Sequence, residues 1–145
     1  MMPTQKPHRS KQDYGTPLDF LKVVKLKLGI DDFSIDLAAS STNAKAPFWW
    51  AEEDDSLSTV TIEEWVEATK GVCGWLNPPF SNIEPWAKKC YECSLMGGKV
   101  ALLVPASVGS NWFMKWVDRK AKVLFISPRL TFEGCKDPYP KDVIL

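Results

Sequence analysis

The sequence has no excess of either charge and almost no histidine. Its 18 Lys and Arg residues equal its 18 Asp and Glu residues, so the formal net charge is +0. A nucleic-acid partner would therefore have to meet a local basic patch, because no large basic field surrounds the chain. His8 is the only histidine. Without a second one, neither a Ser-His nor a Cys-His catalytic arrangement is credible.

Long apolar runs and a signal-peptide h-region are also missing. A membrane span needs roughly twenty apolar residues, so we expect a cytoplasmic protein. The 4 cysteines are few, and the CxxC spacing of Cys90 and Cys93 falls in a stretch predicted to be helical. Structural thiols are therefore favoured over a zinc or redox site, and we expect no metal.

The length and the aromatic content indicate one folded domain. The chain has 145 residues, which is enough to bury a core. Its 7 Trp residues exclude a disordered chain. Residues 1–13 are polar and locally basic, which predicts a flexible leader before a domain at 14–145. The last apolar run, 143–145, stops in mid-strand. Whether the chain is a fragment or a minimal form stays open.

Helices and strands are predicted to alternate along the chain. Thr16 as N-cap and Pro17 at the first helical position would open the first helix. Ser81 and Glu84 would open a later one, with Pro85 as an alternative start. Short connections predict an α/β fold with one doubly wound, mostly parallel sheet and helices on both faces. The predicted strands are 33–38, 72–76, 99–104, 123–126, 129–132 and 143–145; the predicted helices begin at 17, 61, 82 and 110.

The most informative stretch is Asn77-Pro78-Pro79-Phe80, on a predicted turn from a strand to a helix. Two prolines remove two backbone donors and leave the Asn77 and Pro78 carbonyls free to bond a group outside the chain. The Asn77 side-chain oxygen and a carbonyl can accept from an exocyclic amine, while Phe80 stacks on the ring that carries it. The plainer alternative is a rigid turn after a buried strand.

Other polar residues follow predicted strand ends. Asp36 precedes a small-residue loop, where an α/β fold holds the polar end of a cofactor. Residues 105–107 follow the strand at 99–104, so parallel strands would bring both groups to the edge of the sheet that holds Asn77. Asp55, in an acidic stretch beside aromatic residues, is the acid most suited to accept from a ligand amine. A charged surface turn is the plainer interpretation of that stretch.

The Asn77 turn resembles the (D/N/S)PP(Y/F/W) motif of S-adenosylmethionine-dependent amino-methyltransferases. The ordered set around it is similar to the phage-type, Dam-like DNA N6-adenine methyltransferases, over about residues 14–145. The set comprises Thr16-Pro17, residues 35–39 and 43–45, Asp55-Ser56-Leu57, residues 77–80 with Trp86, residues 103–106 with Trp112-Phe113, and residues 129–132.

The resemblance implies a Rossmann-like methyltransferase fold, S-adenosylmethionine as methyl donor and DNA as partner, in a phage or prophage protein. Asn77 and the Pro78 carbonyl would accept from N6 of a flipped-out adenine, with Pro79 completing the motif and Phe80 stacking on the base. Catalysis would be mostly positioning for in-line displacement, with no obligatory general base. The implied cofactor residues are Thr16, Pro17, Asp36 and Ala38 at the methionine end, Asp55 at the adenine or ribose end, and Asn77 itself.

The sequence departs from the wider methyltransferase pattern in two ways. Residues 38–41 replace the glycine-rich cofactor loop, and no stretch is long enough for a separate target-recognition domain. The zero net charge also predicts weak binding to DNA through phosphate contacts. Two alternatives therefore stay open: methylation of another amine, in an RNA base or a protein glutamine, and a non-catalytic or partner-dependent binding module.

Overall fold

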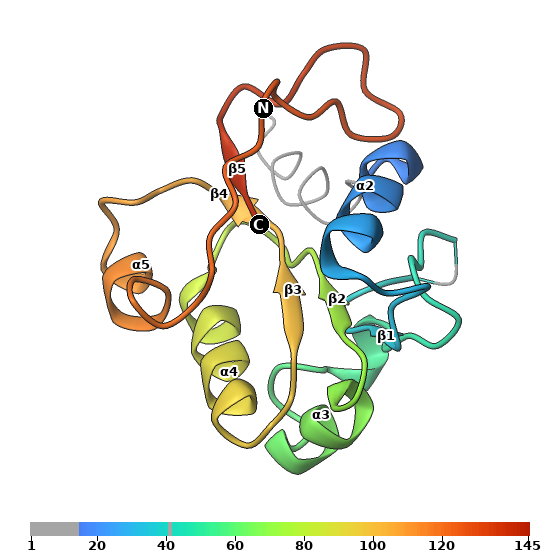
Figure 1. Cartoon of the computed structure of the whole chain (residues 1–145), viewed down its shortest axis with the longest axis vertical. Coiled ribbons are helices and arrows are strands. Elements are labelled where there is room, and N and C mark those ends of the chain that lie inside the picture. Colours follow the sequence, from blue (N-terminus) through green and yellow to red (C-terminus); the bar gives the residue numbers. More distant parts are fainter. Residues whose placement is uncertain (1–14, 41) are drawn as a thin grey trace, which may run out of the picture.

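A small parallel sheet forms the centre of the fold. The computed structural model describes residues 15–40 and 42–145, and the leader expected at 1–13 lies outside them. Within the described residues, β1 (Ile35–Asp36), β2 (Gly74–Leu76) and β3 (Val100–Leu102) pair in that order, all parallel. Figure 1 shows the three strands side by side. The predicted parallel sheet is confirmed, although its strands are shorter than expected.

Helices cover both faces of this sheet. Successive side chains of a strand point to opposite faces, so neighbouring residues of β2 pack in different clusters. On one face, Leu21 and Val24 of α2 (Leu18–Leu28) share a core cluster with Trp75 of β2. On the other face, Trp65 of α3 (Ile62–Thr69) packs in a cluster with Leu76, to which α4 (Glu84–Leu95) contributes. The predicted arrangement of helices on both faces is confirmed.

The start of α2 differs from the prediction. Its N-cap is Pro17, and Gly29 ends it in the left-handed conformation as expected. The Thr16 side chain, predicted to cap the helix, is 1% exposed and bonds Asn77. A buried hydroxyl beside a buried amide satisfies both groups at once, which a solvent-facing cap would not do.

The predicted capping box at Ser81 and Glu84 is also wrong. α4 begins at Glu84 with Ile83 as its N-cap and a proline in its first turn, close to the alternative start at Pro85. The Glu84 carboxylate accepts from Trp116 Nε1 at 3.1 Å, in a contact with the next helix. The capping box predicted at Thr61 is present in α3, so one of the two boxes is confirmed.

Beyond β3 the prediction of further parallel strands is wrong. The run 99–104 divides into β3 and β4 (Val104–Pro105), and β4 pairs antiparallel with β5 (Val143–Ile144). Residues 123–126 contribute an antiparallel bridge from Phe125 to Ile144. Residues 129–132, all described, form no strand, because Leu130 and Phe132 pack as a loop into the cluster beneath α2. η1 (Glu52–Asp54) and α5 (Asn111–Trp116) complete the described elements.

Cys73, Cys90 and Cys93 lie wholly or partly in the packed interior, whereas Cys135 is exposed. Cys73 and Cys93 are buried, and the four cysteines are free. Burial raises the pKa of Cys73 to about 11 and also raises the pKa of Cys90 and Cys93, so these thiols stay protonated at neutral pH. Separately, no helix in the part of the chain that the structure describes is long and apolar enough to cross a membrane.

Candidate functional site

The turn at Asn77 connects the end of β2 with the start of α4, as predicted. Pro78 is fully buried, and its neighbours in the motif are half-buried. Asn77 Nδ2 donates to Thr16 Oγ1 at 3.1 Å, across 61 positions of sequence. The hydroxyl therefore orients the Asn77 amide, and Thr16 belongs to the site through this contact.

A pocket of about 460 Å³ lies beside the turn, within the size range of cofactor sites. Its lining brings together Ala38, Asp55 and Asn77, three of the predicted cofactor residues, with Pro79 of the motif. The rest comes from the loop after β1, from residues 49–56 and from α4: Leu37, Ala39, Ser40, Asn43, Trp49, Ala51, Glu52, Glu53, Ser56 and Trp86. Asn43 belongs to the ordered set of the family resemblance, whereas Ser40 and Glu52 are lining residues to which the sequence analysis gave no role.

Asp36 acts on the pocket through the loop that follows β1. Its carboxylate accepts from the backbone N–H of Ala38 at 3.2 Å and of Lys45 at 2.9 Å. The residue is 3% exposed. Burial raises the pKa of the Asp36 carboxyl to about 6, although both hydrogen bonds and the Lys45 charge lower it. Asp36 therefore fixes the two ends of the loop 38–45, part of which lines the pocket.

Asp55 is part of the lining and bends the chain sharply. Its φ of 48° is left-handed, a conformation that Asp tolerates better than most residues. Its carboxylate accepts from the Ser58 N–H at 3.2 Å and from the Thr59 hydroxyl at 3.2 Å. The side chain thus stabilises its own turn as well as lining the pocket, so the plainer interpretation of this stretch holds in part.

Phe80 packs in an aromatic cluster with two rings from the carboxyl-terminal segment. Its ring lies edge-to-face with Phe132 at 6.4 Å and with Tyr139 at 5.6 Å between centroids. Phe132 and Tyr139 are themselves 5.6 Å apart at an interplanar angle of 86°. The sequence pattern gave no signal for Tyr139, because it is an isolated aromatic in a polar stretch with two prolines nearby.

Several predicted site residues do not join the pocket lining: Thr16, Pro17, Asp36, Pro78, Phe80 and residues 105–107. Pro17 serves as the N-cap of α2. Residues 105–107 follow β3 as expected, but Pro105 belongs to β4 and pairs with Val143. The edge of the sheet therefore brings Asn77 together with the loop that Asp36 holds, while the chain after β3 turns away into the antiparallel pair.

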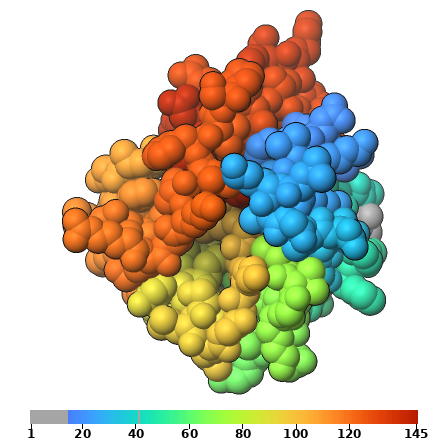
Figure 2. All heavy atoms as spheres, in the orientation of Figure 1, coloured from blue at the N-terminus to red at the C-terminus, as the bar shows by residue number. Residues whose placement is uncertain are grey.

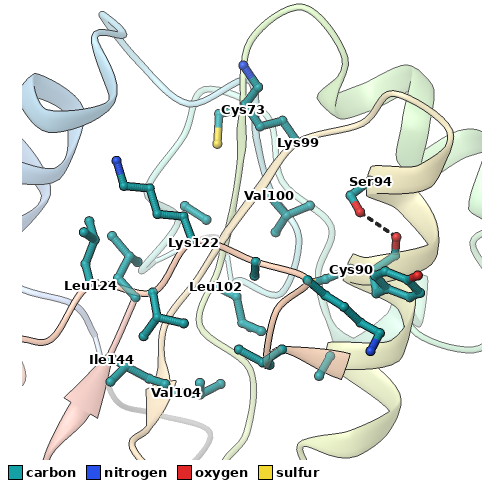
Figure 3. Close-up of a pocket in the computed structure, with 18 of the residues that line it drawn as sticks. Cys73, Cys90, Ser94, Lys99, Val100, Leu102, Val104, Lys122, Leu124 and Ile144 are labelled. Atoms are coloured by element: carbon teal, nitrogen blue, oxygen red, sulfur yellow. Dashed lines mark hydrogen bonds between the residues drawn. The ribbon is translucent and has the colours of Figure 1, made fainter. Parts of the chain in front are cut away.

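A second pocket, of about 370 Å³, lies along the outer edge of β3. Figure 2 shows a hollow on this face where α2, α4 and the segment after α5 meet. Figure 3 draws the side chains of its lining, among them Val100, Leu102 and Lys122. As far as the described residues show, this lining includes none of the predicted site residues. The pocket at Asn77 is therefore the candidate site.

The described residues contain no group of three His, Cys, Asp or Glu side chains that could hold a metal ion. They do contain a pocket-lining residue, Ser56, whose Oγ is buried with no hydrogen-bond partner. Buried polar atoms are nearly always bonded, so this atom fits a ligand with polar groups. The volume and the donor set of the pocket are compatible with a nucleoside-containing cofactor.

Comparisons with known proteins support the resemblance noted in the sequence. The family model described as DNA N-6-adenine-methyltransferase (Dam) matches residues 3–142. A protein named DNA N-6-adenine-methyltransferase from Escherichia phage T1 is 26% identical over 128 residues, which are 88% of this chain and 50% of the phage protein. The chain thus spans about half the length of that relative, and no solved structure matches it. Because the family model covers nearly the whole sequence, the chain belongs to the DNA N-6-adenine-methyltransferase (Dam) family.

Proposed function

We propose that this protein methylates the N6 amine of adenine in DNA, on a Rossmann-like sheet and with S-adenosylmethionine as the methyl donor. The observation that carries the proposal is the position of Asn77. It follows the carboxyl end of β2, lines a cofactor-sized pocket, and belongs to the same turn as Phe80. Family membership supports the substrate, because the phage T1 relative is named for this reaction.

The two sides of the turn suit two different ligands. Asn77 and Pro79 line the pocket, whereas Phe80 packs with Phe132 and Tyr139. In the proposed complex, the Asn77 side-chain oxygen and the Pro78 carbonyl accept from the adenine N6 amine while Phe80 stacks on the base. The donor supplies a methyl group on a positively charged sulfur when it is bound. The protein contributes mainly the placement of the amine for in-line displacement.

The cofactor residues divide into contacts and supports. Ala38, in the loop after β1, is placed at the methionine end, and Asp55 at the adenine or ribose end. Asp36 supports the methionine end by bonding Ala38 and Lys45. Thr16 acts through Asn77, and Pro17 through the start of α2. A phage-encoded relative supports the bacterial cytoplasm as the place of action.

Transfer of tritium from labelled S-adenosylmethionine tests the proposal. Purified protein with duplex DNA should label adenine, and Asn77→Ala should lower the rate at least about 100-fold, because misplacement of the reacting amine by about 1 Å costs that much. Asn111→Ala is the matched control, since Asn111 is exposed on α5. Label in RNA or in protein glutamine, with none in DNA, would show that the protein methylates another amine by the same chemistry.

A partner-dependent or non-catalytic module is the second candidate. Its support is the net charge of +0, which favours few phosphate contacts with DNA. Calorimetry with S-adenosylhomocysteine separates the two. Binding of this product without any labelled adenine favours the second candidate, and binding together with Asn77-dependent label favours the enzyme.

A further inference from the structure

Ser56 combines three properties at the wall of the pocket. The residue is 5% exposed and lines the pocket next to Asp55. Its Oγ is buried, with no hydrogen-bond partner among the described residues. A hydroxyl can donate once and accept twice, and buried polar atoms in folded proteins nearly always have a partner. Oγ is therefore suited to a polar atom of a ligand.

The backbone of Ser56 is held from two helices. Its carbonyl accepts from Lys89 Nζ of α4 at 2.9 Å and from Trp65 Nε1 of α3 at 2.9 Å. Lys89 Nζ also donates to the carbonyls of Leu57, at 2.9 Å, and of Val60. An ammonium group has three donors, and here all three bond a single loop. The ammonium also lies 5.1 Å from the Trp65 ring centroid, within cation–π range.

We propose that the Ser56 hydroxyl hydrogen-bonds the adenosine part of the bound methyl donor, and that Lys89 is the positioning residue that holds Ser56 for this contact. The nature of the ligand rests on the proposed function. The adenosine end is assigned because Ser56 follows Asp55 directly in the chain and lines the same pocket as Asp55 and Trp49, an acid and an aromatic ring. A carboxylate can accept from ribose hydroxyls or a purine amine, and an indole ring can stack on a purine.

Calorimetry with S-adenosylhomocysteine and with adenosine tests the Ser56 contact. Ser56→Ala should weaken both ligands by about tenfold, as expected for one lost hydrogen bond. The melting temperature of the free protein should not fall, because the substitution removes an unbonded buried hydroxyl. Ser58→Ala, at an exposed position in the same loop, should bind both ligands like the wild type. Wild-type affinity of Ser56→Ala for both ligands would overturn the assignment.

Steady-state kinetics test Lys89. Lys89→Met should raise the KM for S-adenosylmethionine about tenfold and leave the KM for DNA unchanged, and Lys89→Arg should restore part of the loss. Lys88→Met is the matched control, because Lys88 is half exposed and pairs with Glu92 at 3.6 Å. A lower melting temperature with an unchanged KM for the donor would contradict the positioning role.

The outcomes also separate this inference from the proposed function. A wild-type protein that binds neither S-adenosylhomocysteine nor adenosine overturns both. Wild-type binding that Ser56→Ala does not weaken overturns the inference alone. Ser56-dependent binding without any labelled adenine overturns the proposed reaction and leaves the Ser56 contact in place.

Discussion

At the scale of single residues, the contact between Thr16 and Asn77 bears most directly on the proposed methyl transfer. Thr16 is 1% exposed and accepts from Asn77 Nδ2 at 3.1 Å. Thr16→Val keeps the shape of the side chain and removes the hydroxyl. A lost hydrogen bond in a buried site costs about 1–3 kcal/mol, so kcat should fall roughly tenfold to a hundredfold.

The same variant should leave the affinity for S-adenosylhomocysteine within about twofold, because Thr16 bonds the Asn77 amide and is not part of the pocket lining. Tritium transfer and calorimetry measure the two quantities. Thr16→Ser, which keeps the hydroxyl, is the control and should retain most of the activity. A loss of activity in Thr16→Ser with wild-type activity in Thr16→Val would show that the methyl group, and not the hydrogen bond, is what matters.

The buried carboxyl of Asp36 should make the stability of the fold depend on pH. Burial raises the pKa of its carboxyl in the folded protein from 3.8 to about 6. The folded state then binds the proton more tightly than the unfolded state does, so this group destabilises the fold above pH 6. That penalty should disappear as the pH falls from about 6 to about 4.

Melting temperatures of the wild type and of Asp36→Asn between pH 7 and 4.5 measure the effect. Asp36→Asn cannot titrate, and its amide nitrogen faces a backbone donor, which adds a cost that does not depend on pH. The stability of the wild type relative to the variant should therefore increase on acidification. A constant difference across this range would contradict the raised pKa.

At the scale of elements, the loop between Leu130 and Tyr139 decides what surrounds Phe80. The Tyr139 N–H donates to the Leu130 carbonyl at 2.7 Å, and Lys45 pairs with Glu133 at 2.7 Å. These bonds place two aromatic rings against Phe80, and each such pair contributes about 0.5–1.5 kcal/mol beyond its area burial. The Arg129–Asp142 pair is exposed and contributes little.

Tyr139→Ala should therefore loosen Phe80 and weaken handling of the target base. With 2-aminopurine at the target position, we expect a smaller fluorescence increase on binding and a KM for DNA raised about tenfold or less. The affinity for S-adenosylhomocysteine should stay unchanged. Tyr139→Phe keeps the ring and is the control. If the affinity for S-adenosylhomocysteine falls by the same factor as the KM for DNA rises, the loop acts on the cofactor and not only on the target base.

At the scale of the whole molecule, the net charge limits the proposed binding to DNA. The formal net charge is +0, so phosphate contacts must be few and local. We expect the slope of log K against log salt concentration to have a magnitude of roughly 3 or less, corresponding to about three phosphates. Fluorescence anisotropy with a labelled duplex, at salt concentrations from about 50 to about 200 mM, measures this slope. A slope of roughly 6 or more would show a concentrated basic patch.

Local signals predicted the elements wherever neighbouring residues supply the cause. The Thr61 capping box, the glycine that ends α2 and the turn at Asn77 all depend on residues within a few positions of one another. The apolar run at 123–126 had the same local signal as a buried strand. The run forms a bridge instead, and Phe125 is 78% exposed. Strand pairing depends on which edge of a sheet a segment can reach, and neighbouring residues do not decide that.

The sequence by itself determined the motif, its place between a strand and a helix, and the family of the chain, because these reside in the order and identity of nearby residues. Only the tertiary structure decided which distant groups meet it. Thr16 bonds Asn77 across 61 positions, and Lys89 bonds Ser56 across 33. Such pairings follow from how α2 and α4 pack on the sheet, and no local pattern encodes which distant groups that packing brings together.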